Sequence, residues 1–81
     1  MRDNEIILLS DEIRAERAKR KLSQEDMAKA LNMSVPTYRD LEYHPNKISL
    51  EQGLIINYML NWNIFDFILS NILQNAIKEN N

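Results

Sequence analysis

The stretch 23–43 constrains the fold most, because it carries the signals of two short helices joined by a tight turn. Ser23 is a favourable N-cap, and Asp26, three residues later, can bond back to complete a shortened capping box. Asn32 then stands at the turn, because Asn tolerates the left-handed backbone conformation better than most residues. Ser34 is a second N-cap. The stretch therefore predicts one helix that ends near Asn32 and a second that begins just after Ser34.

Apolar residues recur at helical spacing on both sides of this turn. Met27, Ala28 and Leu31 share one face of the first helix. Tyr38 and Leu41, three positions apart, give the second helix its inward face. The small side chain of Ala28 falls where the two helices cross. This is the spacing that a helix-turn-helix requires, and the predicted fold class is all-α.

The second helix leaves a group of residues facing outward at its N-terminal end, the end that enters the major groove in such motifs. Pro36 lies in the first turn, where its missing N–H costs nothing. Val35 and Pro36 can only pack on thymine methyl groups, whereas Thr37 can either pack or bond. Arg39 could bond a guanine through two hydrogen bonds, and Asp40 could accept from a cytosine amine. Alternatively, each of these two charged side chains pairs with a neighbouring turn of the same protein.

The stretch from Ile13 to Ile68 resembles the Cro and lambda-repressor family of bacterial and phage DNA-binding domains. The matches to the family pattern are Leu22-Ser23-Gln24-Glu25, Ala28, Leu31, Ser34, Leu41-Glu42 and Ser49-Leu50-Glu51. The resemblance implies a compact five-helix, lambda-repressor-like domain whose second and third helices form the helix-turn-helix. It also implies that Gln24 contacts the DNA backbone, the alternative being an ordinary first-turn polar residue. The predicted DNA-contacting residues are Ser23, Gln24, Ser34, Val35, Pro36, Thr37, Arg39, Asp40 and Lys47.

The chain departs from the pattern of the resembled family at three positions that bear on the fold. Lys21 stands where family members often have Gly, so the start of the following helix is expected to differ slightly. Tyr38 stands where Ile or Val is usual, which requires either a slightly opened corner or a hydroxyl that reaches the surface. Asn57 stands where Ala is usual, and it must find a hydrogen-bond partner if it is buried.

Composition narrows the class of protein. Eighty-one residues predict one small domain, 1–81, with a thin core. The chain has no Cys, and its single His, His44, lies in a predicted loop, so we expect no metal site, no cofactor, no small-molecule ligand and no enzyme. No apolar run is long enough to span a membrane, and no signal sequence opens the chain, so we expect a cytoplasmic protein.

The net charge of −2 is unevenly distributed along the chain. Residues 14–47 carry eight basic and five acidic side chains, whereas the segments on either side are acidic. Because local potential rather than total charge attracts phosphate, DNA is expected at the basic portion. The basic run over 14–21 has two explanations, either a solvated face that suits the negative end of the first helix or a partial contact with the DNA backbone.

Three further helices are expected around the motif. Ser10 is predicted to cap the first of them, and the apolar residues 6–9 to form a helical or ordered lead-in. The fourth helix is predicted to begin at Ser49. Its candidate core residues are Leu50, Leu54, Ile56 and Leu60.

Residues 64–78 predict a fifth, C-terminal helix with an apolar stripe over roughly half of its circumference. One flank of this stripe can close the core over the first and fourth helices. A stripe this wide means either that the helix is deeply embedded or that it pairs with a second subunit, and we favour the second explanation. The predicted dimer interface consists of Phe65, Phe67, Leu69, Leu73 and Ile77. Phe67 is the most discriminating of these, because it lies among polar residues with no explanation inside the domain.

These observations predict a sequence-specific DNA-binding regulator of transcription. We expect a Cro- or repressor-like homodimer on a two-fold symmetric operator of double-stranded DNA. The alternative is a protein-binding module, either an antitoxin or an adaptor with the same fold, because the broad apolar stripe and the acidic ends also fit a protein partner.

Overall fold

The computed structural model describes residues 4–79, with side chains described as far as residue 74. These residues form five α-helices and one turn of 3-10 helix, and they include no strand. In chain order the elements are α1 (Asn4–Lys19), α2 (Gln24–Ala30), α3 (Val35–Tyr43), η1 (Pro45–Lys47), α4 (Leu50–Leu60) and α5 (Ile64–Glu79). The prediction of an all-α, five-helix fold is confirmed.

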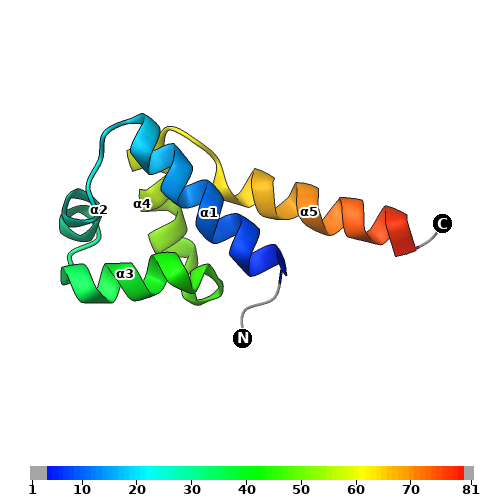
Figure 1. Cartoon of the computed structure of the whole chain (residues 1–81), viewed down its shortest axis with the longest axis horizontal. Coiled ribbons are helices and arrows are strands. Elements are labelled where there is room, and N and C mark those ends of the chain that lie inside the picture. The colour runs from blue at the N-terminus through cyan, green and yellow to red at the C-terminus, as the bar shows by residue number, and fades with distance from the viewer. Residues whose placement is uncertain (1–3, 80–81) are drawn as a thin grey trace.

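The helices form a small compact body from which one helix, α5, projects (Figure 1). α2 and α3 lie together at one end of the molecule, α1 runs across the body, and α4 lies behind α1 in this view. α5 extends away from the body toward the C-terminus, which makes the molecule 44 Å long and only 27 Å by 22 Å across. The helix-turn-helix and the far end of α5 are therefore at opposite ends of the molecule.

The start of α2 and the turn between α2 and α3 are formed as their residues predict. Ser23 Oγ accepts from the Asp26 backbone N–H at 3.0 Å, and Asp26 Oδ2 accepts from the Ser23 N–H at 2.8 Å, which completes the capping box. Asn32 has a φ of 56°, in the left-handed region, and Ser34 caps α3. Lys21 also has a positive φ, of 55°, so the backbone follows a glycine-like path here despite the side chain.

The core is assembled from apolar residues of all five helices. Its buried members are Leu9, Ile13, Met27, Ala28, Leu31, Tyr38, Leu41, Ile56, Leu60 and Ile64. The Tyr38 hydroxyl is enclosed and has no hydrogen-bond partner among the described residues, so it does not reach the surface. Burial, and then the nearby Glu42 carboxylate, raise the pKa of Tyr38. The inward faces predicted for α2 and α3 are confirmed.

α1 begins earlier than predicted and contains Ser10 in its interior. The Ser10 side chain is buried, and its hydroxyl donates to the backbone carbonyl of Glu42 at 2.7 Å. The predicted N-cap at Ser10 is therefore wrong. The apolar residues before Ser10 form the first turns of α1, and the Ser10 hydroxyl instead joins α1 to the end of α3.

The core prediction for α4 is correct for two residues and wrong for two. Ile56 and Leu60 are buried, but Leu50 and Leu54 are 70% and 56% exposed. The inward face of α4 passes through Gly53, whose missing side chain leaves room for a neighbour. Leu50 and Leu54 are turned away from this face, so their apolar character does not serve the core of the domain.

Asparagine side chains and backbone shape the corner between α4 and α5. Asn61 ends α4 with a φ of 45°, in the left-handed region. Asn57 Oδ1 accepts from the Ile64 backbone N–H at 2.8 Å, which supplies the hydrogen-bond partner that this residue was expected to need. Asn63 Oδ1 accepts from two backbone N–H groups in the first turn of α5. The corner thus satisfies the free donors at the start of α5.

Two aromatic residues of α5 contact other parts of their own chain. Phe67 is half-buried and its ring lies 5.7 Å from the ring of Trp62, centroid to centroid. The Phe65 ring packs over Gly53, where a Cβ atom added to the glycine would come within 2.7 Å of it. The expectation that Phe67 has no explanation inside the domain is therefore wrong.

Candidate nucleic-acid interface

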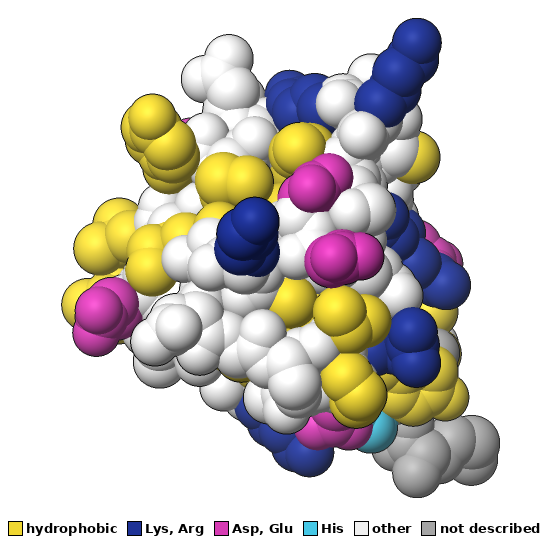
Figure 2. Space-filling model, turned by 90° about the vertical axis from the view of Figure 1, so that its left-hand side faces the viewer, with side chains coloured by type: hydrophobic (Ala, Val, Ile, Leu, Met, Phe, Trp, Pro, Cys, Tyr) yellow, Lys and Arg dark blue, Asp and Glu magenta, His cyan; other side chains and the backbone are white. Residues whose placement is uncertain are grey.

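The outer face of α3 presents most of the residues predicted to contact DNA. Pro36, Thr37, Arg39 and Asp40 are exposed, whereas Val35 is half-buried and packs against the core. Figure 2 views the α2 and α3 end of the molecule and shows basic, acidic and apolar side chains interspersed over it. The interface is therefore a mixed surface, on which specific contacts can matter more than a uniform positive potential.

The hydroxyl groups at the start of α3 are linked to each other. Ser34 Oγ accepts from the Thr37 backbone N–H at 3.3 Å and lies 2.7 Å from Thr37 Oγ1. Both side chains are exposed. Each hydroxyl can therefore stabilise the first turn of the helix and still offer a lone pair or a proton to a DNA group.

Gln24, at the first position of α2, lies between two side chains of α3. Its Oε1 accepts from Arg39 Nε at 3.2 Å. Its Nε2 lies 3.5 Å from Glu42 Oε1, at the long limit of a hydrogen bond. The structure thus brings together Gln24 and Arg39, two residues that the sequence predicted separately.

Glu42 is held from the other side by Arg17. Arg17 Nε donates to Glu42 Oε2 at 3.0 Å, and its Nη2 donates to Oε1 at 3.2 Å. The Nη1 of Arg17 donates to the backbone carbonyl of Leu22 at 2.9 Å. This pair joins α1, the segment before α2, and α3 beneath the candidate interface. Sequence reasoning missed it, although a carboxylate beside Leu41 on the inward face of α3 was a signal for a buried partner.

Asp40 and Lys47 form an exposed ion pair across the end of α3. Lys47 Nζ lies 3.3 Å from Asp40 Oδ2, and His44 Nε2 lies 3.9 Å from Asp40 Oδ1. Lys47 partly neutralises Asp40, which lowers the cost of bringing this carboxylate near phosphate. Exposed pairs of this kind are weak, on the order of 1 kcal/mol or less, so DNA can displace the partner.

The basic run at the end of α1 is largely paired with acids of the same protein. Arg14 pairs with Asp11, and Lys19 and Arg20 both pair with Glu16. Hydrogen bonds from Lys19 and then Arg20 hold the pKa of Glu16 below its ordinary value. Arg17 is likewise bound to Glu42. These pairings favour the explanation that the basic run suits the negative end of α1 and neutralises nearby acids, rather than the explanation that it contacts the DNA backbone.

The described residues contain no group of three or more His, Asp or Glu side chains that could hold a metal ion. Among the same residues, no helix has the length and apolar character needed to cross a lipid bilayer.

The fold and this interface define a helix-turn-helix protein. A family model of the Cro/C1 type, described as helix-turn-helix, matches residues 13–54, which is more than half of the chain. The chain belongs to this family, whose members are DNA-binding regulatory domains, and it is a DNA-binding regulator of transcription. No curated protein matches the chain, and neither does any solved structure.

Proposed function

We propose that the protein binds a two-fold symmetric operator as a Cro- or repressor-like homodimer, with residues 1–81 acting as one DNA-binding domain. Each protomer places α3 in a major groove, so the two half-sites lie about 34 Å apart, one turn of DNA. The observation that carries this proposal is the exposed N-terminal end of α3. Capping by Ser34 fixes this end, and the α2 packing holds it outward.

The contacts divide into base readers and backbone anchors. Arg39 is the side chain best suited to a guanine, and Asp40 to a cytosine amine while Lys47 remains close enough to balance its charge. Val35 and Pro36 offer apolar surface to thymine methyl groups. The backbone anchors are Ser23, Ser34, Thr37 and Lys47, with Thr37 also able to face a base.

Dimerisation is proposed to use the apolar flank of α5. Leu69, Ile72 and Leu73 are 53%, 57% and 53% exposed. Because Phe65 and Phe67 contact their own protomer, we place the centre of the proposed dimer interface, called the seam below, at Leu69, Ile72 and Leu73. Ile77, also predicted at the interface, lies outside the residues whose side chains are described. An exposed aliphatic cluster of this kind is a common sign of a protein–protein contact.

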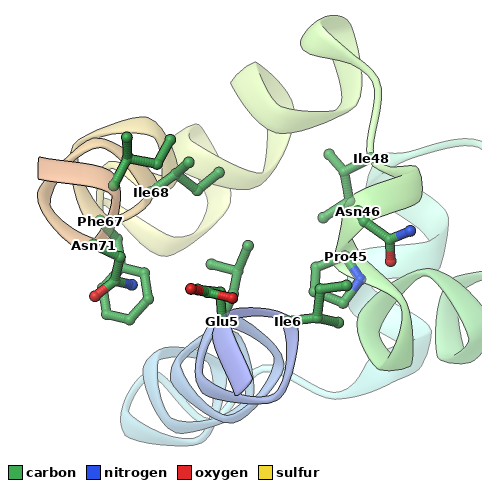
Figure 3. Close-up of a pocket in the computed structure, with 10 residues that line it drawn as sticks. Glu5, Ile6, Pro45, Asn46, Ile48, Phe67, Ile68 and Asn71 are labelled. Atoms are coloured by element: carbon green, nitrogen blue, oxygen red, sulfur yellow. The ribbon is translucent and has the colours of Figure 1, made fainter. Parts of the chain in front are cut away.

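A groove beside α5 extends this apolar flank (Figure 3). It has a volume of about 420 Å³ and is formed by the start of α1, η1 with the following Ile48, and the first half of α5. Ile6, Ile48 and Ile68 give it an apolar lining. Ile72 belongs both to the groove and to the exposed flank, so the two form one continuous surface. A second copy of α5 is the occupant that we propose.

The test is selection of bound sequences from a random duplex pool, followed by binding to the selected and a random duplex at several salt concentrations. We expect a two-fold symmetric site, and an affinity that falls linearly on a logarithmic scale between about 50 and 200 mM salt. A pool without enrichment, or a flat salt response, would contradict the proposal.

A second candidate function is a protein-binding adaptor or antitoxin, and one observation favours it. Leu50, Leu54 and Tyr58 recur every four residues along α4 and are 70%, 56% and 84% exposed. Such a ridge fits the contact of a protein partner. A pure adaptor would show neither sequence enrichment nor salt-dependent DNA binding, so the same experiment separates the two candidates.

A further inference from the structure

One side-chain amide connects the buried interior to the proposed reading helix. Gln24 Oε1 accepts from Arg39 Nε at 3.2 Å, while Gln24 Nε2 faces Glu42 Oε1 at 3.5 Å. Glu42 is itself fixed by two hydrogen bonds from Arg17. The order of contacts therefore runs from a buried ion pair, through a half-buried amide, to an exposed guanidinium.

Without such a contact, the exposed Arg39 side chain would have many rotamers. Arginine has a large rotamer entropy, part of which is lost when it binds a base. A hydrogen bond at Nε restricts this freedom before DNA arrives. It also leaves both terminal nitrogens of the guanidinium available, and these two nitrogens can together reach the two acceptors of a guanine edge.

We infer that Gln24 is a positioning residue for Arg39, so that Gln24 acts on the specificity of the protein through the orientation of the guanidinium. This inference rests on the proposed operator binding and assigns Gln24 a role other than the expected backbone contact. The amide geometry supports the assignment, because Oε1 is occupied by Arg39 and Nε2 faces Glu42. To donate to a phosphate, Nε2 would have to turn away from Glu42.

The experiment measures binding of Gln24→Ala, Arg39→Ala and the double variant to the selected operator and to operators with single base-pair changes. We expect Arg39→Ala to remove discrimination at one base pair in each half-site. Gln24→Ala should lower discrimination at that same base pair by about tenfold, and the double variant should lose no more there than Arg39→Ala alone. Circular dichroism and thermal melting of each variant verify that the fold is retained.

A matched variant, Gln24→Glu, separates positioning from backbone contact. A carboxylate can still accept from Arg39 Nε, and Arg39 and Arg17 together balance its charge and that of the facing Glu42. It cannot donate to phosphate, and its charge repels the DNA backbone. We expect Gln24→Glu to recover discrimination at the Arg39 base pair relative to Gln24→Ala, while its affinity for every sequence falls. If Gln24 were a phosphate donor, Gln24→Glu would instead lower all affinities without recovering any discrimination.

Two results would overturn the positioning role alone. One is that Gln24→Ala lowers the affinity for operator and for random DNA by the same factor, and that in the double variant this factor multiplies with the factor lost in Arg39→Ala. The other is an unchanged binding profile in Gln24→Ala. If the unmodified protein has no sequence preference, the operator proposal itself fails, and the positioning role fails with it.

Discussion

Arg17 of α1 and Glu42 of α3 form a bidentate ion pair beneath the candidate DNA interface. The guanidinium donates to both carboxylate oxygens, at 3.0 Å and 3.2 Å, and the two side chains are 17% and 2% exposed. Desolvation offsets much of the attraction in such a pair. Its main contribution is therefore positional, because Arg17 also binds the Leu22 carbonyl and so fixes α3 relative to the segment that leads into α2.

The first prediction is that removing one member of this pair destabilises the protein more than removing both. Arg17→Met should lower the free energy of unfolding by about 3–5 kcal/mol, because it leaves the Glu42 charge buried without its partner. Arg17→Met combined with Glu42→Leu should recover most of this loss. Urea unfolding followed by circular dichroism measures both. A double variant no more stable than the single variant would contradict the prediction.

The second prediction is a loss of stability in acid. The Ser23 backbone N–H, and then the Ser23 hydroxyl, hold the pKa of Asp26 below its ordinary value of 3.8, while Lys19 and Arg20 lower the pKa of Glu16 below 4.5. Both carboxyls thus bind fewer protons in the folded than in the unfolded protein. Their contribution is complete above these ordinary values and declines as the pH falls through the lower, folded-state pKa values.

Urea midpoints measured from about pH 7 to about pH 2.5 test this dependence. The midpoint should decline in the acid range for the unmodified protein. Asp26→Asn and Glu16→Gln should each lower the midpoint at neutral pH and make its decline in acid less steep. Ser70→Ala, at an exposed and uncharged position of α5, is the control and should keep the original slope. Variants that keep the original slope as well would show that these carboxyls are not responsible.

The residues that cap helices or form turns were predictable from the sequence, because each acts on the backbone conformation only a few positions away. Ser23, Asp26, Asn32 and Ser34 each determine a cap or a turn by bonding to their immediate neighbours. The corner between α4 and α5 was less predictable. The ring of Phe67 has its partner in Trp62, and nothing in the periodicity of α5 indicates that contact.

The tertiary placement of α4 and the pairing of charges required the structure. Leu50 and Leu54 have the same apolar character as Ile56 and Leu60, and the flank that faces inward is the one that packs Ile56 and Leu60 into the core and Gly53 against Phe65. Likewise, Arg17 lies four residues after the buried Ile13, on the inward face of α1, but the sequence does not show which partner it would meet there. Its buried role follows from the position of Glu42, 25 residues away.

The third prediction concerns the contact between Gly53 and Phe65. Replacing a helical Gly with Ala normally stabilises by about 1 kcal/mol. Here the added carbon would come within 2.7 Å of the Phe65 ring, so the ring must move. We expect Gly53→Ala to give no net stabilisation in the unmodified protein, but a gain of about 1 kcal/mol in a Phe65→Ala background. Equal effects in both backgrounds, measured by urea unfolding, would exclude the steric coupling.

The fourth prediction tests the proposed dimer seam on α5. Leu69 and Leu73 lie one turn apart on the exposed flank, so Leu69→Asp with Leu73→Asp places two charges in the seam without replacing a buried residue. We expect a folded monomer by sedimentation and circular dichroism. Its operator affinity should fall by orders of magnitude, because one module alone buries too little surface for tight binding.

Two control pairs with the same spacing and the same number of added charges make this test specific. Ser70→Asp with Gln74→Asp alters an exposed polar part of α5 and should leave the dimer intact. Leu50→Asp with Leu54→Asp alters the exposed ridge of α4 and should also leave it intact, because the groove that we propose for the second copy is lined by α5 and not by α4. If the α4 pair gives monomers while the Leu69 and Leu73 pair does not, the seam lies on α4. If the Leu69 and Leu73 pair unfolds the protein, these residues belong to the core of their own protomer, and the proposal of an α5 seam is wrong.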